Sequence, residues 1–442
     1  MIGTDIQNGY YQDHRRIENT LPGRKVPWLA RLRSEALERF MAHGFPSSRE
    51  ENWKYIDQLP LKRRHFRPAR AERPLSKDDL VPYLPDDHAR WRMVFVNGRF
   101  APSLSRLEGL PAGVTVSGLA ATLEHEPAML EPYLGRYADI NGQGFGALNT
   151  AFMNDGAYIR LGPGAIAEEP VHLVYVASGA GDSVAHVRNL VVAGENSQGT
   201  LVETYLSLDD ESCFTNVITE VISAQGAHLA HYKLGQESVR TLHLAGIYIH
   251  QGRNSQYAAC NVAGDGQWVR NDLNVVLDAE GGDCILNGLY FTAAHQQVEH
   301  HTRIDHRAGH GTSRQLYKGV MDDHSRGIFS GRVVVHPNAQ KTDARQTNNN
   351  LLLSENAEAI SRPQLEIYAD DVKCAHGSTV GYLDEEALFY LRSRALDEDH
   401  ARNLLVYAFA SDILQQITLM PVRAYLERRL ANRFLKGPPS EA

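Results

Sequence analysis

Between about residues 141 and 379, short apolar or alternating segments recur, separated by Gly, Asn, Asp or Ser. No long stretch with helical spacing interrupts them, and their starts lie roughly 12 to 16 residues apart, as in all-β sandwiches and β-solenoids. The turns contain few two-residue loops of the hairpin type, which favours a solenoid whose coils bury their apolar faces against one another. The predicted strands include Leu201–Tyr205, Val217–Ile222, Leu229–Leu234, Leu244–Ile249, Tyr257–Val262, Leu273–Leu277, Cys284–Phe291, Leu316–Val320 and Gly327–Val333.

The first 80 or so residues have a helical pattern instead. From Trp28 to Met41, apolar residues recur three or four positions apart, and Gly44 is a stop signal. Ser47 and Ser48 are each followed three residues later by a glutamate, which predicts a capping box before a second short helix that contains Trp53.

The last 60 or so residues are also predicted to be helical. Asp384 is a candidate N-cap, a second helix is predicted from Glu398 to about Leu419, and a third follows Pro421. Residues 404–410 are apolar all round, so this helix must be covered on more than one side. Packing within the chain and docking of a partner both explain that pattern.

These zones predict three domains. Residues 1–135 form a mainly helical N-terminal domain with a mixed connecting segment, whose short strands include residues 93–96. Residues 136–380 form the β core, and residues 381–442 form a C-terminal helical domain.

Composition and charge exclude several classes of protein. The net charge of -8 gives no reason to expect a nucleic acid or an anionic membrane as partner. The apolar segments are too short to span a bilayer, and the first residues have neither the basic nor the apolar part of a secretion signal. The four cysteines form no Cys-x-x-Cys pair, which fits a protein of the reducing cytosol without disulfides.

The segment Asp371–Thr379 brings a thiol and an imidazole close together. If it is extended, Cys374 and His376 lie on the same face because side chains alternate along a strand. A thiolate beside an imidazole is a soft pair that suits zinc, copper or iron–sulfur clusters. Such a metal or cluster site needs four ligands, and this segment offers two. Either another polypeptide supplies the remaining ligands, or Cys374 acts only as a small buried apolar residue.

A second candidate is the histidine-rich segment His300–His310. In a strand, His300 and His306 share one face, and His301 lies on the other with Asp305. Imidazoles and a carboxylate that converge from neighbouring strands would make a cupin-type metal site. The alternative is a ladder of hydrogen-bonded polar side chains along stacked coils.

Motifs of self-contained enzymes are missing. The chain has no Gly-x-Ser-x-Gly elbow, no His-Glu-x-x-His and no phosphate-binding Gly-x-x-x-x-Gly-Lys-Ser/Thr loop. The glycine-rich segment 141–146 follows no predicted strand and is not expected to open a helix, so it is a weak dinucleotide motif. The chain is therefore not expected to hydrolyse nucleotides by itself.

Several sequence blocks occur in a characteristic order: Ser325–Val333, Gln340–Ala344, Gln346–Ser354, Pro363–Ile367 and Leu388–Arg394. In these blocks the chain resembles the SufB/SufD family of iron–sulfur cluster assembly proteins. The match runs from about Asn141 to the C-terminus, with a looser match at Glu51–Tyr55.

Within this family the chain resembles the SufD branch. SufB carries a Glu-His-Glu-Ala element where this chain has Ala375-His376-Gly377-Ser378, and the chain lacks the cysteine-rich segment often seen in the first half of SufB. The resemblance implies a right-handed parallel β-helix flanked by helical N-terminal and C-terminal domains. It also implies a non-enzymatic scaffold in a cytoplasmic SufB–SufC–SufD complex.

The resemblance further implies where the partners bind. Cys374 and His376 would lie at the interface with a SufB-like paralogue, where a transient iron–sulfur cluster forms, with no cofactor bound stably to the isolated chain. A SufC-like ABC ATPase would dock on the C-terminal helices; a homodimer of the isolated chain and a flavin on the complex stay open. The rival hypothesis is a free-standing β-solenoid or cupin-type metalloenzyme that uses His300–His310. The candidate partner-binding residues are Leu388, Leu391, Leu404, Tyr407 and Phe409.

Overall fold

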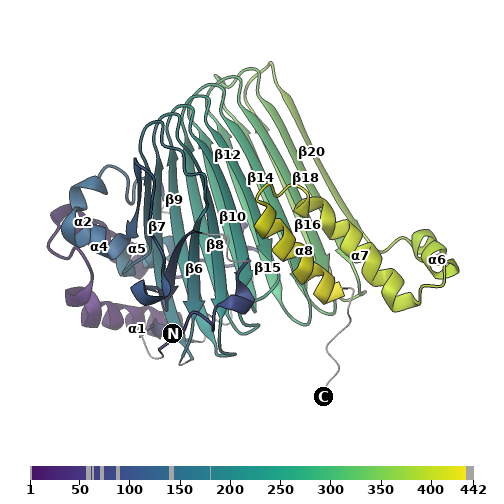
Figure 1. The fold of residues 1–442 in the computed structure, drawn as a ribbon, viewed down its shortest axis with the longest axis horizontal. Coiled ribbons are helices and arrows are strands. Elements are labelled where there is room, and N and C mark those ends of the chain that lie inside the picture. The colour runs from purple at the N-terminus through teal and green to yellow at the C-terminus, as the bar shows by residue number, and fades with distance from the viewer. Residues whose placement is uncertain are drawn as a thin grey trace.

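The chain forms a β-solenoid with helices at both ends (Figure 1). The computed structural model describes residues 2–55, 61, 64–69, 74–85, 90–138, 144–179 and 181–434, without the side chains of residues 2–5. From β5 onward, strands that follow one another in sequence alternate between two sheets, so that each coil contributes one strand to each sheet. The mainly β solenoid core expected from the sequence is confirmed.

In the described residues the two sheets have ten strands each. The first sheet, in spatial order, contains β4 (Val114–Gly118), β5 (Ala157–Leu161), β7 (Ser183–Ala193), β9 (Cys213–Ser223), β11 (Leu242–Gln251), β13 (Trp268–Leu277), β15 (Gln297–His306), β17 (Arg326–Val335) and β19 (Glu358–Ile367), with β1 (Arg67–Pro68) paired to β7. The second sheet contains β3 (Arg99–Phe100), β2 (Trp91–Val96), β6 (Val171–Ala177), β8 (Gln198–Ser207), β10 (His228–Gln236), β12 (Gln256–Ala263), β14 (Asp283–Thr292), β16 (Thr312–Met321), β18 (Asp343–Leu352) and β20 (Lys373–Gly381).

Parallel pairing between coils distinguishes this fold from a sandwich. From β5 to β18 each strand pairs in parallel with the strand of the next coil. His300, for example, lies opposite Asn271 on one side and Phe329 on the other. Antiparallel pairs occur only at the N-terminal end of the described sheets, between β2 and β3 and between β4 and β5. A sandwich would be built mainly from antiparallel pairs.

In each coil, one turn leads from a strand of the first sheet to the next strand, in the second sheet. The backbone of this turn explains why the loops are rich in Gly and Asn. In successive coils, one residue of this turn has a left-handed backbone and donates its N–H to a carbonyl of the next coil, over 2.6 to 3.2 Å. Gly and Asn adopt the left-handed conformation at the lowest cost. The residues in this position are Asn196, Gly226, Asn254, Gly281, His310 and Lys341.

The interior of the solenoid is packed with aliphatic and aromatic side chains from both sheets. The rings of Phe95, Tyr175 and Tyr205 stack along its axis, with centroids 5.0 and 4.7 Å apart. Cysteine contributes to this packing as an apolar residue, because Cys284 is fully buried and burial raises the pKa of its thiol. None of the four cysteines, all of which are described, forms a disulfide.

The interior also holds a chain of buried ionisable groups. Lys233 Nζ lies 2.8 Å from His243 Nε2 and donates to Asn271 Oδ1 over 2.9 Å, and His243 Nδ1 lies 2.6 Å from Glu237 Oε2. Burial lowers the pKa of Lys233 to about 8. These groups satisfy one another across the two sheets, as buried charges must.

Helices at the N-terminal end cover the outer face of the first sheet. Gly44 ends α2 (Pro27–His43) as predicted, with φ +67° and its N–H bonded to the Phe40 carbonyl. The predicted second helix is a single 3-10 turn, Glu51–Trp53, after a hydrogen bond from the Ser47 N–H to Glu50 Oε1. The other helices of this region are α1 (Ile2–Ile17), α4 (Leu119–His125) and α5 (Gly144–Phe152), with 3-10 turns at Glu18–Thr20, Val81–Tyr83, Pro102–Leu104 and Pro127–Met129.

The expectation that the glycine-rich segment 141–146 opens no helix is wrong. Residues 141–143 lie outside the described part, but α5 begins at Gly144. A Cβ on Gly144 would lie 2.0 Å from the carbonyl oxygen of Gly44, so the glycine lets α5 pack directly against the end of α2. The segment serves close helix packing, which its local pattern does not reveal.

The C-terminal helices cover the outer face of the second sheet. They are α6 (Glu385–Ser393), α7 (Glu398–Leu414) and α8 (Met420–Phe434). Asp384 caps α6 as predicted, accepting from the N–H groups of Glu386 and Ala387. The α7 helix ends at Leu414 rather than Leu419, because the chain turns back so that the Thr418 hydroxyl meets Tyr232 OH at 2.9 Å.

Packing within the chain explains much of the apolar character of α7. Val406, Ala410 and Ile413 are buried in a cluster with side chains of the second sheet. By contrast, α6 projects from the body of the molecule (Figure 1). None of the described helices is long and apolar enough to cross a membrane.

The role of Gly144 can be tested by Gly144→Ala. The added methyl group must displace backbone, so we expect a loss of about 2–3 kcal/mol in the free energy of unfolding, measured by urea denaturation. Gly164→Ala is the control, because Gly164 has φ +70° but open space around it, and only left-handed strain of about 1–2 kcal/mol applies. A loss for Gly144→Ala no larger than that of the control would contradict the packing role.

Candidate functional site

The C-terminal end of the solenoid is open. In the described part of the chain, β19 pairs only with β17 and β20 only with β18. Most side chains of β19 are half-buried and most of β20 are exposed, unlike those of the preceding coils. Unpaired backbone groups on an exposed edge are a template for pairing with another chain.

The structure places Cys374 and His376 on β20, at this open end. In the strand register they lie opposite Ala344 and Gln346, which are buried in the interior. Side chains alternate along a strand, so both belong to the column of β20 that continues the interior face of the solenoid. This geometry agrees with the same-face prediction, whereas their roles as ligands stay predictions.

The two side chains differ in environment. Cys374 is half-buried and packs against a small apolar cluster that includes Val335 and Ala344, whereas His376 is exposed. Burial raises the pKa of the Cys374 thiol, and a backbone hydrogen bond with Ala344 opposes that shift. The thiol is therefore mostly protonated near neutral pH, and a metal that binds it must displace the proton.

Buried polar groups on β18 and β19, in the last coils, also lack hydrogen-bond partners. Both amide atoms of Gln346 are buried without a hydrogen-bond partner, and the same is true of the Ser361 hydroxyl. Among the described residues, no group of three or more His, Cys, Asp or Glu side chains is arranged to hold a metal ion. The described part of the chain therefore offers Cys374 and His376 as two donors.

The histidines of His300–His310 do not converge. His300 lies between the rings of Tyr290 and Tyr317, with both centroids 5.2 Å away, and burial lowers its pKa to about 3. His306 Nε2 lies 2.9 Å from the Ser313 hydroxyl inside the solenoid, and His301 lies on the outer face. The structure thus favours the ladder of polar side chains over a cupin-type metal site.

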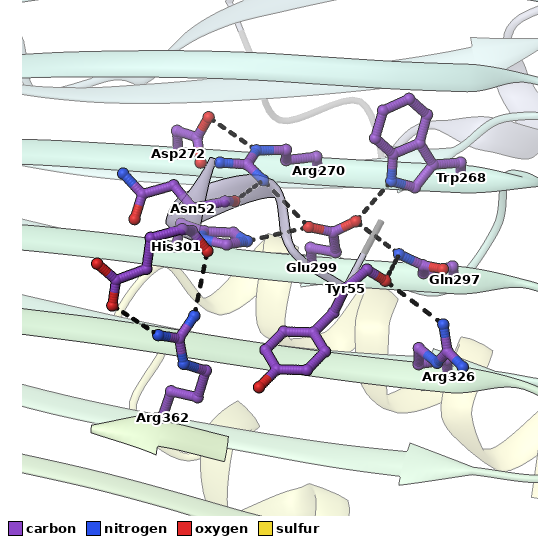
Figure 2. A network of polar contacts seen from close by, with 11 residues as sticks. Asn52, Tyr55, Trp268, Arg270, Asp272, Gln297, Glu299, His301, Arg326 and Arg362 are labelled. Atoms are coloured by element: carbon purple, nitrogen blue, oxygen red, sulfur yellow. Dashed lines mark hydrogen bonds and ion pairs between the residues drawn. The ribbon is translucent and has the colours of Figure 1, made fainter. Parts of the chain in front are cut away.

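An N-terminal strap, residues 51–55, supports the open end from outside (Figure 2). Arg270 of β13 donates to the Asn52 carbonyl over 2.9 Å, and Arg326 of β17 to the Tyr55 carbonyl over 3.4 Å. Arg362 of β19 donates to Glu51 Oε1 over 2.9 Å. The strap therefore links the terminal coil to the coils before it.

A buried carboxylate holds the strap's partners in place (Figure 2). Glu299 is fully buried; its Oε1 accepts from Trp268 Nε1 over 2.7 Å, and its Oε2 from Arg270 over 3.2 Å. Burial favours the neutral acid, but the hydrogen bond with His301 and the charge of Arg270 outweigh it and lower the pKa of Glu299. Arg270 in turn lies 3.7 Å from the Trp53 ring, which fixes the strap by a cation–π contact.

The candidate partner-binding residues of the C-terminal helices fall into two groups. Leu388, Leu391 and Leu404 are at least partly exposed. Tyr407 and Phe409 pack against the cluster on the second sheet, so their apolar character is at least partly explained within the chain. Their role in binding a partner stays a prediction.

The sequence reasoning did not single out the most exposed aromatic residues of this region. Phe389 is 75% exposed and Tyr390 57% exposed on α6, Tyr382 just before α6 is 62% exposed, and Tyr368 after β19 is 61% exposed. Phe389 and Tyr390 belong to the block Leu388–Arg394 that carried the family resemblance. The exposure of Phe389 and Tyr390 depends on α6 projecting away from the other described elements (Figure 1), which sequence pattern does not report.

The geometry defines a helix-flanked β-solenoid with an unpaired terminal coil. Residues 175–409 match the family model described as SUF system FeS cluster assembly, SufBD core domain, and residues 4–173 match the SufBD protein N-terminal region. The chain therefore belongs to the SufBD family of iron–sulfur cluster assembly proteins, as the sequence blocks indicated.

Full-length relatives agree with this family. The chain is 32% identical to an iron–sulfur cluster assembly SufBD family protein of Synechocystis sp., over 92% of this chain and 91% of that one. It is 31% identical to the iron–sulfur cluster assembly protein SufD of Escherichia coli, over 91% of this chain and 92% of that one. It is 27% identical to SufD of Bacillus subtilis, over 90% and 92% of the two chains.

The strap network makes a prediction about Glu299→Gln. Loss of the carboxylate leaves Arg270 without one of its two buried partners, so we expect a loss of about 3 kcal/mol in the free energy of unfolding at pH 7. Because folding lowers the pKa of Glu299 below its ordinary 4.5, this stabilisation is fully present above that value and is lost as pH falls through the folded pKa.

Urea denaturation between pH 3 and 7 measures the free energy of unfolding of the wild type and of Glu299→Gln. The difference between these two free energies should shrink at the acidic end. Glu358→Gln is the control, because Glu358 also pairs with an arginine of the first sheet, Arg326, but is 49% exposed. Similar losses of unfolding free energy for Glu299→Gln and Glu358→Gln would show that the burial of Glu299 does not strengthen the strap network.

Proposed function

We propose that this chain is a non-enzymatic, cytoplasmic scaffold subunit that pairs with a SufB-like paralogue through its open end. The observation that carries this proposal is the terminal coil, where no strand of the described residues pairs with the outer edge of β19 or of β20. Tyr368 and Val380, which is 50% exposed, add apolar surface to that edge. A partner with a similar coil would continue both sheets and cover these side chains.

In the proposed pair, Cys374 and His376 are this chain's share of a site for a nascent iron–sulfur cluster. Thiolate and imidazole are both known cluster ligands, and a cluster needs more donors than these two. The partner would supply the rest across the interface. The cluster is cargo that forms there and leaves, so no cofactor is assigned to the isolated chain, and no residue here is assigned to a flavin.

The C-terminal helices are proposed as the docking surface for a SufC-like ABC ATPase. The chain has no phosphate-binding loop of its own, and α6 presents Phe389 and Tyr390 to solvent. Leu388, Leu391 and Leu404 lie on the same pair of helices. Exposed aromatic residues are the typical anchors of a protein interface.

A contact under α7 connects this docking surface to the solenoid. Lys318 of β16 donates to the Phe409 carbonyl over 3.0 Å and forms an ion pair with Asp412 at 2.5 Å. The Lys318 ammonium also lies over the Phe409 ring, 4.5 Å from its centroid. Movement of the helices by a docked ATPase would pass through these contacts to the second sheet, whose last strand carries Cys374.

The shared cluster site is tested by His376→Ala and Cys374→Ser in the co-expressed complex. We expect iron and acid-labile sulfide in the purified complex to fall at least about fivefold while the subunits stay associated. Lys373→Ala is the control, because Lys373 is exposed on the same strand, in the alternate column. Unchanged iron and sulfide with an intact complex would contradict the site, and stoichiometric zinc or iron on the isolated chain would favour the rival metalloenzyme.

The ATPase surface is tested by Phe389→Ser. Loss of a central aromatic anchor should weaken capture of the ATPase by at least about tenfold, measured by quantitative pull-down. Val239→Ser is the control, because Val239 is a large exposed apolar residue, 58% exposed, in the turn after β10. Equal capture by the two variants would show that α6 is not the docking surface.

A further inference from the structure

A pocket of about 970 Å³ lies between α1 and α2, away from the site described above. In Figure 1 these helices lie at the left of the solenoid, whereas β20 lies at its right-hand end. Leu21, Ala30, Leu37 and Met41 form an apolar part of the wall. This volume lies at the upper end of the range found for small-molecule sites.

Cations outnumber anions around this pocket. Arg15 is neutralised by Glu18, at 3.1 Å. Arg24 and Lys25 lie at the exposed rim, and neither forms an ion pair with another residue in the described part of the chain. Glu38, the other acid of the wall, accepts a hydrogen bond from the Ser34 hydroxyl. Arg33 and His14 are the remaining ionisable groups, and burial lowers the pKa of His14, which favours its neutral form.

Arg33 is the most unusual member of the wall. It is only 5% exposed, and its two terminal nitrogens donate to the carbonyls of Pro22 and Met153, both over 2.8 Å. Its Nε is buried without a hydrogen-bond partner, and no carboxylate of the described residues forms an ion pair with it. Glu124 acts on it only at longer range, and burial lowers the pKa of Arg33 to about 10. A buried cation without a counter-ion is rare in proteins.

His14 is a second buried polar group of the wall. It is 7% exposed, and its ring interacts with the backbone of Ala151. Its Nδ1 lies 4.0 Å from Glu18 Oε2. Arg33 and His14 both line the pocket, so an anion placed there would lie beside a buried cation that has no carboxylate partner among the described residues.

We propose that this pocket binds a small amphipathic organic anion. Its apolar body would pack against Leu21, Leu37 and Met41, and its single acid group, such as a carboxylate, would lie toward Arg33 and the rim cation Lys25. The proposal is independent of the assembly function, because it uses no residue of the open end or of the C-terminal helices.

The test is titration calorimetry of the full chain with decanoate, below its micellar concentration, and with decanol. We expect one decanoate per chain and binding of decanol weaker by at least about tenfold, because decanol lacks the charge. Lys25→Glu should weaken decanoate binding by about fivefold. Arg31→Glu makes the same change of charge at an exposed position of α2 outside the pocket, and it should stay within about twofold of the wild type.

Ala30→Trp fills the pocket from an exposed position and should abolish binding. Ser34→Trp, also exposed and on the wall, repeats that test, and circular dichroism checks that both variants stay folded. Equal binding of decanol and decanoate, equal effects of Lys25→Glu and Arg31→Glu, or retained binding in both tryptophan variants would each overturn the proposal. Retained binding would place the ligand on another apolar surface, such as the open end.

Discussion

Parallel hydrogen bonding between successive coils is the interaction on which the rest of this structure depends. A coil has apolar side chains inside but little core of its own, so it is stable only when its backbone is paired on both sides. At the N-terminal end the antiparallel strands β3 and β4 end the described sheets. At the C-terminal end β19 and β20 have no such neighbour in the described chain. The same constraint that builds the solenoid therefore exposes the edge that carries Cys374 and His376.

The outer faces of the two sheets are used differently. The second sheet is covered by α7 and α8, which bury a continuous apolar cluster. The first sheet is covered near its start by the N-terminal helices and, toward its end, by the short strap with its charged network. The helices contribute mainly apolar burial, whereas the strap acts through the buried pairing of Glu299 and Arg270. A paired buried charge specifies one position of the strap, because any other position leaves a charge without a partner.

Much of the fold was readable from local pattern. The alternating segments became strands, Asp384 became an N-cap, and Gly44 ended its helix. These features depend on neighbours in sequence, which is why the pattern reports them. The start of α5 at Gly144 was missed, because the reason for that glycine is the carbonyl of Gly44 one hundred residues earlier. The histidines of His300–His310 could not be assigned for a similar reason, since their partners lie on neighbouring coils.

By itself, the sequence determined the strands, the turns between them, the helical ends and the family, because side-chain alternation and turn residues are local signals and the family blocks are contiguous. It also placed Cys374 and His376 on one face of one strand. Only the tertiary structure decided that this strand is the unpaired last one, and that Arg270 meets a carbonyl 218 residues away. It also decided that Arg33 is buried beside a pocket, with no carboxylate partner in the described part of the chain. The physical reason is that coil stacking and helix docking set which distant residues meet, and no local pattern encodes that register.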